Sequence, residues 1–291
     1  MQLPKKAIIT VAGIGTRFLP ATKAVPKEML PIIDRPVVQY IVEELIESGI
    51  RDIIIVVRQG AKATEEHFGV NRDLERQLKE AGKKDKLRQV RSLSKMAKFT
   101  FIEQTQKMPY GNATPLKISA SLVKDRPFLY LFGDDITIAK IPVCKQLIET
   151  YKKERDAEGV VGVRRVPKKE VVRYGTIKIK KGTGNVIEDM VEKPTVSQAP
   201  SNIVQDGRFL LTPKILPIIN RLKRGKDNEL WLIDAVLELA QKNKVVVHEI
   251  EGKWLTTGDP LNYLKAMVEL AWQRDDLREG FKKYVVGKLK K

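Results

Sequence analysis

The first residues that could do chemistry form a glycine-rich segment near the N-terminus. An apolar, β-branched stretch, Ala7–Val11, runs into Gly13–Arg17 with the sequence GIGTR. Glycines after a buried strand allow backbone N–H groups to approach phosphate oxygens closely, and Arg17 adds a planar fork of donors. The dinucleotide fingerprint is incomplete because Phe18 stands at its third glycine, and no P-loop string follows. For two glycines alone, a tight turn between strand and loop is the better interpretation.

The segment that follows favours phosphate binding instead. Phe18–Pro31 is a long, proline-bounded loop that holds two lysines, Lys23 and Lys27, directly after Arg17. Charge-assisted hydrogen bonds from arginine and lysine are the strong contacts to phosphate. The sequence therefore predicts a loop that closes over a triphosphate.

Two adjacent carboxylates follow another apolar stretch. Asp134 and Asp135 come after Gly133, at the end of the expected strand Phe128–Phe132. The carboxyl ends of parallel strands are where α/β sheets bind ligands, and Mg²⁺ takes one or two carboxylates beside phosphate and water. Adjacent side chains in an extended segment point to opposite sides, so Asp134 is the expected ligand and Asp135 is not. Gly-Asp-Asp alone is also an ordinary turn.

A glutamate and a lysine end an expected strand in the second half of the chain. Glu192 and Lys193 precede a proline in the string EKP. Lys193 could neutralise a phosphate, and Glu192 could accept hydrogen bonds from sugar hydroxyls. A solvated strand end is the alternative interpretation.

Alternating apolar runs and helix-period segments indicate an α/β fold. A strand at Ala7–Val11, a helix at Pro36–Gly49 and a strand at Ile53–Val57 form a βαβ unit, which implies a parallel sheet. The later pattern predicts a mixed sheet in the second half. Further strands are expected at Phe99–Glu103, Phe128–Phe132, Gly159–Val163, Thr176–Lys180, Val186–Val191 and Arg208–Leu211. Further helices are expected at Ala113–Val123, Pro213–Leu222, Asn228–Gln241 and Pro260–Arg274.

Two segments are polar and basic. Residues 71–98 predict a helical insertion with a solvated face, and they lack the interleaved aromatics of a nucleic-acid-binding segment. Lys282–Lys291 is a basic tail that is expected to fray. No internal repeat or Pro- or Ser-rich linker divides the chain, so residues 1–291 are expected to form a single domain.

Composition bounds the partners and the compartment. The chain has 291 residues, 42% hydrophobic and 31% charged, which is typical of a globular protein. Its 54 Lys and Arg exceed its 36 Asp and Glu and give a net charge of +18, which favours a polyanionic partner. The single Cys144 shows no nucleophile pattern, and His67 and His248 lack metal-ligand spacing. Without a disulfide framework, a signal peptide or an apolar run near ~18 residues, we expect a cytoplasmic protein.

The motifs, in their order, closely resemble the signature of prokaryotic UTP–glucose-1-phosphate uridylyltransferases, within the wider family of sugar-nucleotide pyrophosphorylases. The resemblance spans about residues 5–270. It implies a Rossmann-like nucleotidyltransferase fold, α/β, with a mixed central sheet flanked by helices. The blocks that carry it are Val11–Lys23, Pro26–Pro31, Gln39–Glu44, Gly133–Asp135, Val191–Pro194, Ala199–Asn202 and Gly258–Pro260.

The resemblance also implies roles for individual residues. It places the nucleotide in a half of about residues 1–140 and the sugar phosphate in a half of about 141–275. The implied catalytic residues are Arg17, Lys27, Asp134 and Lys193, with Asp134 as the Mg²⁺ ligand. The implied nucleotide contacts are Ala12, Gly13, Gly15, Thr16 and Arg17 for the triphosphate, and Gln104 and Gly111 for the uracil edge. The implied contacts to glucose and its phosphate are Gly175, Glu192 and Lys193.

The sequence departs from the family pattern at three positions. Thr256 stands ahead of Gly258 where the family often has an aspartate, which puts a second metal ligand in doubt. Asn112 replaces a histidine of the base loop, and Ile233 replaces a threonine before Asp234. These last two changes bear on the identity of the base and the sugar.

The resemblance implies transfer of a uridylyl group from UTP to glucose 1-phosphate with Mg²⁺, giving UDP-glucose and pyrophosphate. It also implies a homo-oligomer, a dimer or tetramer, with neither nucleic acid nor membrane as partner. A thymidylyltransferase or a dual UTP/dTTP enzyme is the nearest alternative, because one methyl group changes binding by only ~1–3 kcal/mol. A basic nucleic-acid-binding protein is the non-enzyme alternative, although no familiar module is visible. A catalytically silent homologue is disfavoured because the implied catalytic residues are all present.

Overall fold

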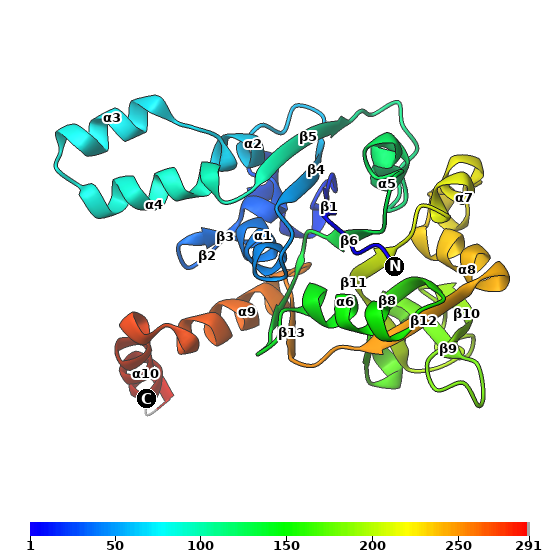
Figure 1. Ribbon diagram of the computed structural model, residues 1–291. Coiled ribbons are helices and arrows are strands. Elements are labelled where there is room, and N and C mark those ends of the chain that lie inside the picture. Colours follow the sequence, from blue (N-terminus) through cyan, green and yellow to red (C-terminus); the bar gives the residue numbers. More distant parts are fainter. Residues whose placement is uncertain (290–291) are drawn as a thin grey trace.

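The centre of the molecule is a nine-stranded mixed sheet (Figure 1). The computed structural model describes residues 1–289, apart from the side chain of Lys226. The strand order is β10-β9-β11-β6-β1-β4-β5, with β8 paired to β11 and β12 paired to β8. The strands are β1 Lys6–Val11, β4 Asp52–Arg58, β5 Lys98–Gln104, β6 Phe128–Phe132, β8 Ala157–Arg165, β9 Gly175–Ile179, β10 Ile187–Glu192, β11 Ile203–Leu211 and β12 Lys244–Glu249.

The first half of the chain forms the parallel part of the sheet. Strand β1 pairs in parallel with β4 and β6, and β4 pairs in parallel with β5. Because the carboxyl ends of these strands lie at one edge, the glycine-rich segment after β1 and the Gly133 turn after β6 meet there. Gln104, the last residue of β5, ends at the same edge opposite Arg58.

The second half adds antiparallel strands to the same sheet. Strand β11 runs antiparallel to β6, β8 and β9, whereas β12 runs parallel to β8. The mixed central sheet expected from the sequence is therefore confirmed. Two small antiparallel sheets lie beside it, β7 Asp135–Ile138 with β13 Lys253–Thr256, and β2 Pro31–Ile32 with β3 Arg35–Pro36. The β7–β13 pairing sets Thr256 opposite Asp135.

Helices cover both faces of the sheet because alternate strand residues point to opposite sides. Ile8 and Ile54 belong to one core cluster and Ile9 and Ile55 to the other. Packing apolar helix faces against each side buries both clusters. The first face carries α5 Thr114–Ser119, α7 Ile215–Arg221 and α8 Leu232–Lys242, and the second carries α1 Val37–Glu47 and α6 Val143–Lys153.

Two helical pairs project from this core (Figure 1). One is the expected basic insertion, which forms α3 Arg72–Glu80 and α4 Lys84–Lys95 beyond the short α2 Ala63–Phe68. The other is α9 Pro260–Gln273 followed by α10 Asp275–Leu289. No residue of α3, α4 or α10 is buried in the described part of the chain. Within residues 1–289, none of the helices has the length and apolarity that crossing a bilayer requires.

The basic tail is helical over most of its length. Residues 282–289 continue helix α10, while Lys290 and Lys291 lie outside the described residues. An aromatic contact between Trp272 and Phe281, with ring centroids 5.9 Å apart, joins α10 to α9. The basic composition hid this contact, because the apolar residues that make it precede the charged end.

Two elements begin four or five residues away from their predicted starts. Helix α8 begins at Leu232 and not at Asn228, since Asp227 and Asn228 have positive φ values of 57° and 61° that no α-helix continues. Strand β11 begins five residues before Arg208, where buried Gln205 and Asp206 interrupt the apolar pattern. Strands β7, β12 and β13 were not predicted.

Candidate active site

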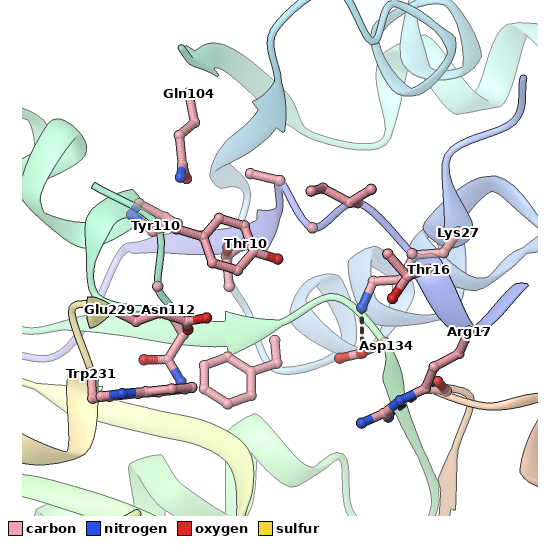
Figure 2. Close-up of a pocket in the computed structure, with 18 of the residues that line it drawn as sticks. Thr10, Thr16, Arg17, Lys27, Gln104, Tyr110, Asn112, Asp134, Glu229 and Trp231 are labelled. Atoms are coloured by element: carbon pink, nitrogen blue, oxygen red, sulfur yellow. Dashed lines mark hydrogen bonds and ion pairs between the residues drawn. The ribbon is translucent and has the colours of Figure 1, made fainter. Parts of the chain in front are cut away.

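A cleft of about 420 Å³ opens at the carboxyl ends of β1, β5 and β6. Figure 2 shows Arg17 and Lys27 at one end and Gln104 and Tyr110 at the other. The expected site residues that line it are Ala12, Gly13, Gly15, Thr16, Arg17, Lys27, Gln104, Gly111, Asp134 and Lys193. Gly175 and Glu192 are not among its lining residues. Lining residues that the sequence analysis missed include Thr10, Tyr110, Phe132, Glu229 and Trp231.

The loop after β1 is more ordered than expected. It folds into three single turns of 3₁₀ helix, η1 Thr16–Phe18, η2 Ala21–Lys23 and η3 Lys27–Met29. The Thr22 hydroxyl donates a 2.8 Å hydrogen bond to the Gly15 carbonyl and ties the loop back onto the glycine-rich segment. Only Lys27 of the two loop lysines lines the cleft. The positive charge of this loop thus enters the cleft from two positions, Arg17 and Lys27.

An ion pair occupies the floor of the cleft. The Lys27 ammonium lies 2.5 Å from Asp134 Oδ2 (Figure 2). Burial alone would raise the pKa of the Asp134 carboxyl, but the Lys27 ammonium and the nearby Arg17 hold that pKa below its ordinary value. Burial would likewise lower the pKa of Lys27, and Asp134 raises it overall. Both groups therefore remain charged at neutral pH.

A second loop, residues 256–258, brings a hydroxyl oxygen close to Asp134 and Arg17. A β-carbon built on Gly258 would lie 3.6 Å from Asp134 Oδ2, Thr256 Oγ1 and Arg17 Nη1 alike. The Thr257 backbone and hydroxyl both donate to the Asp134 carbonyl, at 2.9 and 2.8 Å. Thr256, the residue that departs from the family pattern, therefore lies in the neighbourhood of the candidate metal carboxylate, and its side chain hydrogen-bonds to Asp135. Asp135 points elsewhere and accepts a 3.0 Å hydrogen bond from Trp254.

The other end of the cleft presents a buried amide. Gln104 is buried, and its Oε1 has no hydrogen-bond partner among the described residues. Gly111 has φ 125°, and a β-carbon there would lie 2.2 Å from the Leu230 carbonyl oxygen. Only glycine allows this close approach, which holds the loop around Gly111 against the start of α8. A buried amide without a partner is costly unless a ligand satisfies it.

Asn112 has a structural role in the same loop. Its Oδ1 accepts a 2.7 Å hydrogen bond from the backbone N–H of Leu232, one of the unsatisfied donors at the start of α8. Its carbonyl accepts a 2.5 Å hydrogen bond from the Tyr130 hydroxyl. The replacement of the family histidine by Asn112 therefore supplies a helix contact beside the candidate base pocket.

The remaining expected residues form a cluster behind the cleft wall. The Lys193 ammonium lies 4.3 Å from the centre of the Trp231 ring and 3.8 Å from Glu192 Oε1. A β-carbon on Gly175 would meet Glu192 Oε2 at 3.0 Å and the Ile233 side chain at 2.5 Å. Gly175 and Glu192 are therefore neighbours of Lys193, which alone of the three lines the cleft. Ile233, the third departure, packs here as a core residue.

A buried carboxyl group lies next to Lys27 in the chain. Glu28 is 1% exposed, and neither of its carboxyl oxygens has a hydrogen-bond partner among the described residues. Burial raises the pKa of Glu28 to about 7, against a smaller lowering by its own backbone N–H and by the Lys27 charge. Glu28 is thus substantially protonated at neutral pH.

This raised pKa predicts a pH-dependent effect of Glu28→Gln on stability. The folded chain binds the Glu28 proton more tightly than the unfolded chain. The contribution of this proton to the free energy of unfolding is therefore complete below pH 4.5 and is lost as the pH rises through about 7. Glutamine keeps the neutral shape. We expect the variant to match wild type at about pH 4, below the unfolded pKa, and to exceed it at pH 8, by up to about 3 kcal/mol. Urea unfolding at both pH values measures this, and equal differences at both would contradict it.

The fold and the cleft together define the class of protein to which the chain belongs. A parallel sheet edge with a glycine-rich loop, cationic side chains and a carboxylate is the site of a nucleotide-binding α/β protein. Residues 6–273 match the Nucleotidyl transferase family, and the chain belongs to that family.

Individual proteins of this family show more specifically what the chain is similar to. The chain is 40% identical over 293 aligned residues to a UTP–glucose-1-phosphate uridylyltransferase of Bacillus subtilis, covering 100% of this chain and 99% of the relative. A solved UDP-glucose pyrophosphorylase complexed with UDP-glucose is 33% identical with a TM-score of 0.83, covering 94% and 100%. A UTP-bound enzyme of the same kind from Acinetobacter baumannii is 29% identical with a TM-score of 0.84, covering 98% and 99%. The resemblance and the fold class expected from the sequence are confirmed.

Proposed function

We propose that the chain transfers a uridylyl group from UTP to glucose 1-phosphate, giving UDP-glucose and pyrophosphate. The observation that carries this proposal is one cleft with Arg17 and Lys27 at one end and the buried amide of Gln104 at the other. A nucleoside triphosphate has the same polarity, with anionic phosphates and a base that can hydrogen-bond. The full-length similarity to uridylyltransferases supports UTP and glucose 1-phosphate as the substrates.

The reaction needs no general base. The second pKa of a phosphate monoester is about 6, so glucose 1-phosphate is largely a dianion at neutral pH. One of its oxygens attacks the α-phosphorus of UTP, and pyrophosphate leaves with the broken bond's electron pair. Neither of the histidines, His67 and His248, lines the cleft. The protein therefore acts by alignment and by charge neutralisation.

The cleft residues divide that task. Arg17 and Lys27, with the backbone N–H groups of residues 12–16, would bind the triphosphate. Lys193 would bind the sugar phosphate and reduce the repulsion between the two anions. Alignment of the two substrates at near-attack distance can contribute roughly 7–11 kcal/mol.

The cleft fits a magnesium ion that binds together with the nucleotide. Among the residues that the structure describes, no cluster of three or more His, Cys, Asp or Glu side chains could hold a metal. Asp134 offers one carboxylate, and the Thr256 hydroxyl offers a neutral oxygen beside it. Mg²⁺ commonly takes one or two carboxylates and completes its shell with phosphate and water. When bound, it supplies positive charge to the triphosphate.

The proposal also includes the domain organisation of the chain, its oligomeric state and its location in the cell. It assigns the nucleotide to about residues 1–140 and the sugar phosphate to about 141–275 of a single domain, a homo-oligomer of the cytoplasm. The continuous nine-stranded sheet supports the single domain, because both segments contribute strands to it.

Gln104→Ala is expected to reduce base selectivity more than triphosphate affinity. Loss of the amide removes a hydrogen bond to the base and leaves Arg17 and Lys27 in place. We expect the ratio of UTP to CTP turnover to fall about tenfold, because a hydrogen bond of this kind contributes about 1.4 kcal/mol. Gln106→Ala is the matched control, since Gln106 follows in the same loop but does not line the cleft. An unchanged ratio in the Gln104 variant would place the base pocket elsewhere.

Pyrophosphate release over a grid of nucleoside triphosphates and sugar 1-phosphates tests the proposed function. The highest rate is expected for UTP with glucose 1-phosphate and Mg²⁺. A higher rate with dTTP would replace the proposal by a thymidylyltransferase, and equal rates would indicate a dual enzyme. No release with any pair would overturn the proposal.

A further inference from the structure

Arg208 is a fully buried arginine directly below the turn that carries Asp134. It lies on β11, and its side chain is 2% exposed. Its Nη1 donates to the Phe132 carbonyl at 3.3 Å, and its Nη2 donates to the Asp135 carbonyl at 2.7 Å. These two carbonyls flank Gly133 and Asp134. One guanidinium group therefore holds both ends of the turn.

The turn has little other freedom. The Gly133 N–H donates a 3.0 Å hydrogen bond to the Thr10 carbonyl, and a β-carbon on Gly133 would lie 2.2 Å from Val11. On its other side, the Thr257 contacts with the Asp134 carbonyl close the ring of bonds around the turn. Arg208 supplies the two charge-assisted hydrogen bonds of this set, because its guanidinium donates to the backbone carbonyls at both ends of the turn.

A carboxylate on the opposite side holds the guanidinium in place. Glu44 of α1 accepts from Arg208 Nη2 at 2.9 Å and from Nε at 3.3 Å. Its Oε1 also accepts from the backbone N–H of Cys144, at the start of α6. A buried charge is costly unless it is paired and its donors are satisfied. The contacts of Arg208 meet that condition and connect the turn to two helices.

We propose that Arg208 is a positioning residue for Asp134. By holding the Phe132 and Asp135 carbonyls, it fixes the direction in which the Asp134 carboxylate meets Lys27 and the divalent cation. The proposal rests on the proposed function, because that function requires the cation. Arg208 does not line the cleft and contacts no substrate in it.

Arginine is required here for its shape. Its planar fork reaches a carboxylate and two carbonyls at once, whereas a lysine ammonium is a compact point charge that cannot span these acceptors in a fixed plane. Arg208→Lys therefore keeps the buried positive charge and loses the simultaneous hydrogen bonds to the Phe132 and Asp135 carbonyls. It is the most conservative change that tests the proposal.

A neighbouring arginine provides a matched control. Arg164 of β8 is also buried, with its Nε 3.4 Å from Asp206. Its guanidinium donates to the Gly252 carbonyl and to Thr137, both at 2.9 Å. Arg164→Lys removes a comparable fork from the same core. Its hydrogen bonds are to residues outside the Asp134 turn.

The experiment compares Mn²⁺ binding to the two variants and to wild type in the presence of UTP, by electron paramagnetic resonance of the free ion. We expect Arg208→Lys to weaken Mn²⁺ binding at least tenfold and Arg164→Lys to change it less than twofold. Thermal unfolding should show a loss of stability in both variants. Equal weakening in both, or wild-type Mn²⁺ binding by the Arg208 variant, would overturn the proposal.

Two further measurements keep the outcome interpretable. If Arg208→Lys does not fold, Glu44→Gln removes the carboxylate that orients the guanidinium and is expected to weaken Mn²⁺ binding about threefold or more; unchanged binding would overturn the proposal. Wild type that binds Mn²⁺ and UTP but forms no UDP-glucose would contradict the proposed function alone. Wild type that binds no Mn²⁺ with UTP would overturn the role of Arg208.

Discussion

Replacing Asp134 with asparagine is expected to lower the rate of UDP-glucose formation by a factor of about 10² to 10³, the scale seen when one electrostatic stabiliser is lost. Asp134 is the carboxylate on the floor of the cleft, 2.5 Å from the Lys27 ammonium. Asparagine keeps the size and removes the charge. The Lys27 ammonium then loses its partner, and a divalent cation loses its one strong protein ligand.

Thr256→Ala tests whether a second ligand matters. The Thr256 hydroxyl stands beside Asp134 but is neutral, so it is a weaker ligand for Mg²⁺ than a carboxylate. We expect this change to lower the rate much less than the Asp134 change. We also expect Mg²⁺ to bind weakly to the free protein and more tightly when UTP is present.

Titration of Mg²⁺ into wild type and both variants, with and without UTP, measures these differences together with the turnover rate. Tight Mg²⁺ binding to the free wild-type protein would contradict the proposal that Asp134 is the one carboxylate that binds the ion. Near-normal turnover by the Asp134 variant would contradict it as well.

The parallel half of the fold was predictable because its signals are local. Ala7–Val11 and Ile53–Val57 are runs of apolar, mostly β-branched residues, and both form buried strands within a residue of the expected bounds. Helix α1 shows an apolar stripe that matches its buried face. Strands β7 and β13 carry no such pattern. They form because residues 135–138 and 253–256 meet in space, which the local sequence does not encode.

The same distinction separates the two kinds of site residue. The glycine-rich segment could be recognised because backbone chemistry and chain position are visible in the sequence. Arg208 and Trp231 could not, because each acts through a partner far away in the chain, Arg208 on the Asp134 turn and Trp231 on Lys193. Their own neighbours in sequence are strand and helix residues without a motif.

Lys193→Ala is expected to raise the KM for glucose 1-phosphate about 10- to 100-fold, the value of about 1.5–3 kcal/mol for a hydrogen bond to a charged group, with the KM for UTP little changed. The Lys193 ammonium lies over Trp231 at the wall of the cleft, away from the Lys27–Asp134 pair that we propose to face the triphosphate. Lys178→Ala is the matched control, because Lys178 lies on strand β9, pairs with Glu188 of β10 and does not line the cleft. Initial rates measured with each substrate varied in turn separate the two constants. Equal weakening of both substrates in the Lys193 variant would show that this lysine does not distinguish the sugar phosphate from UTP.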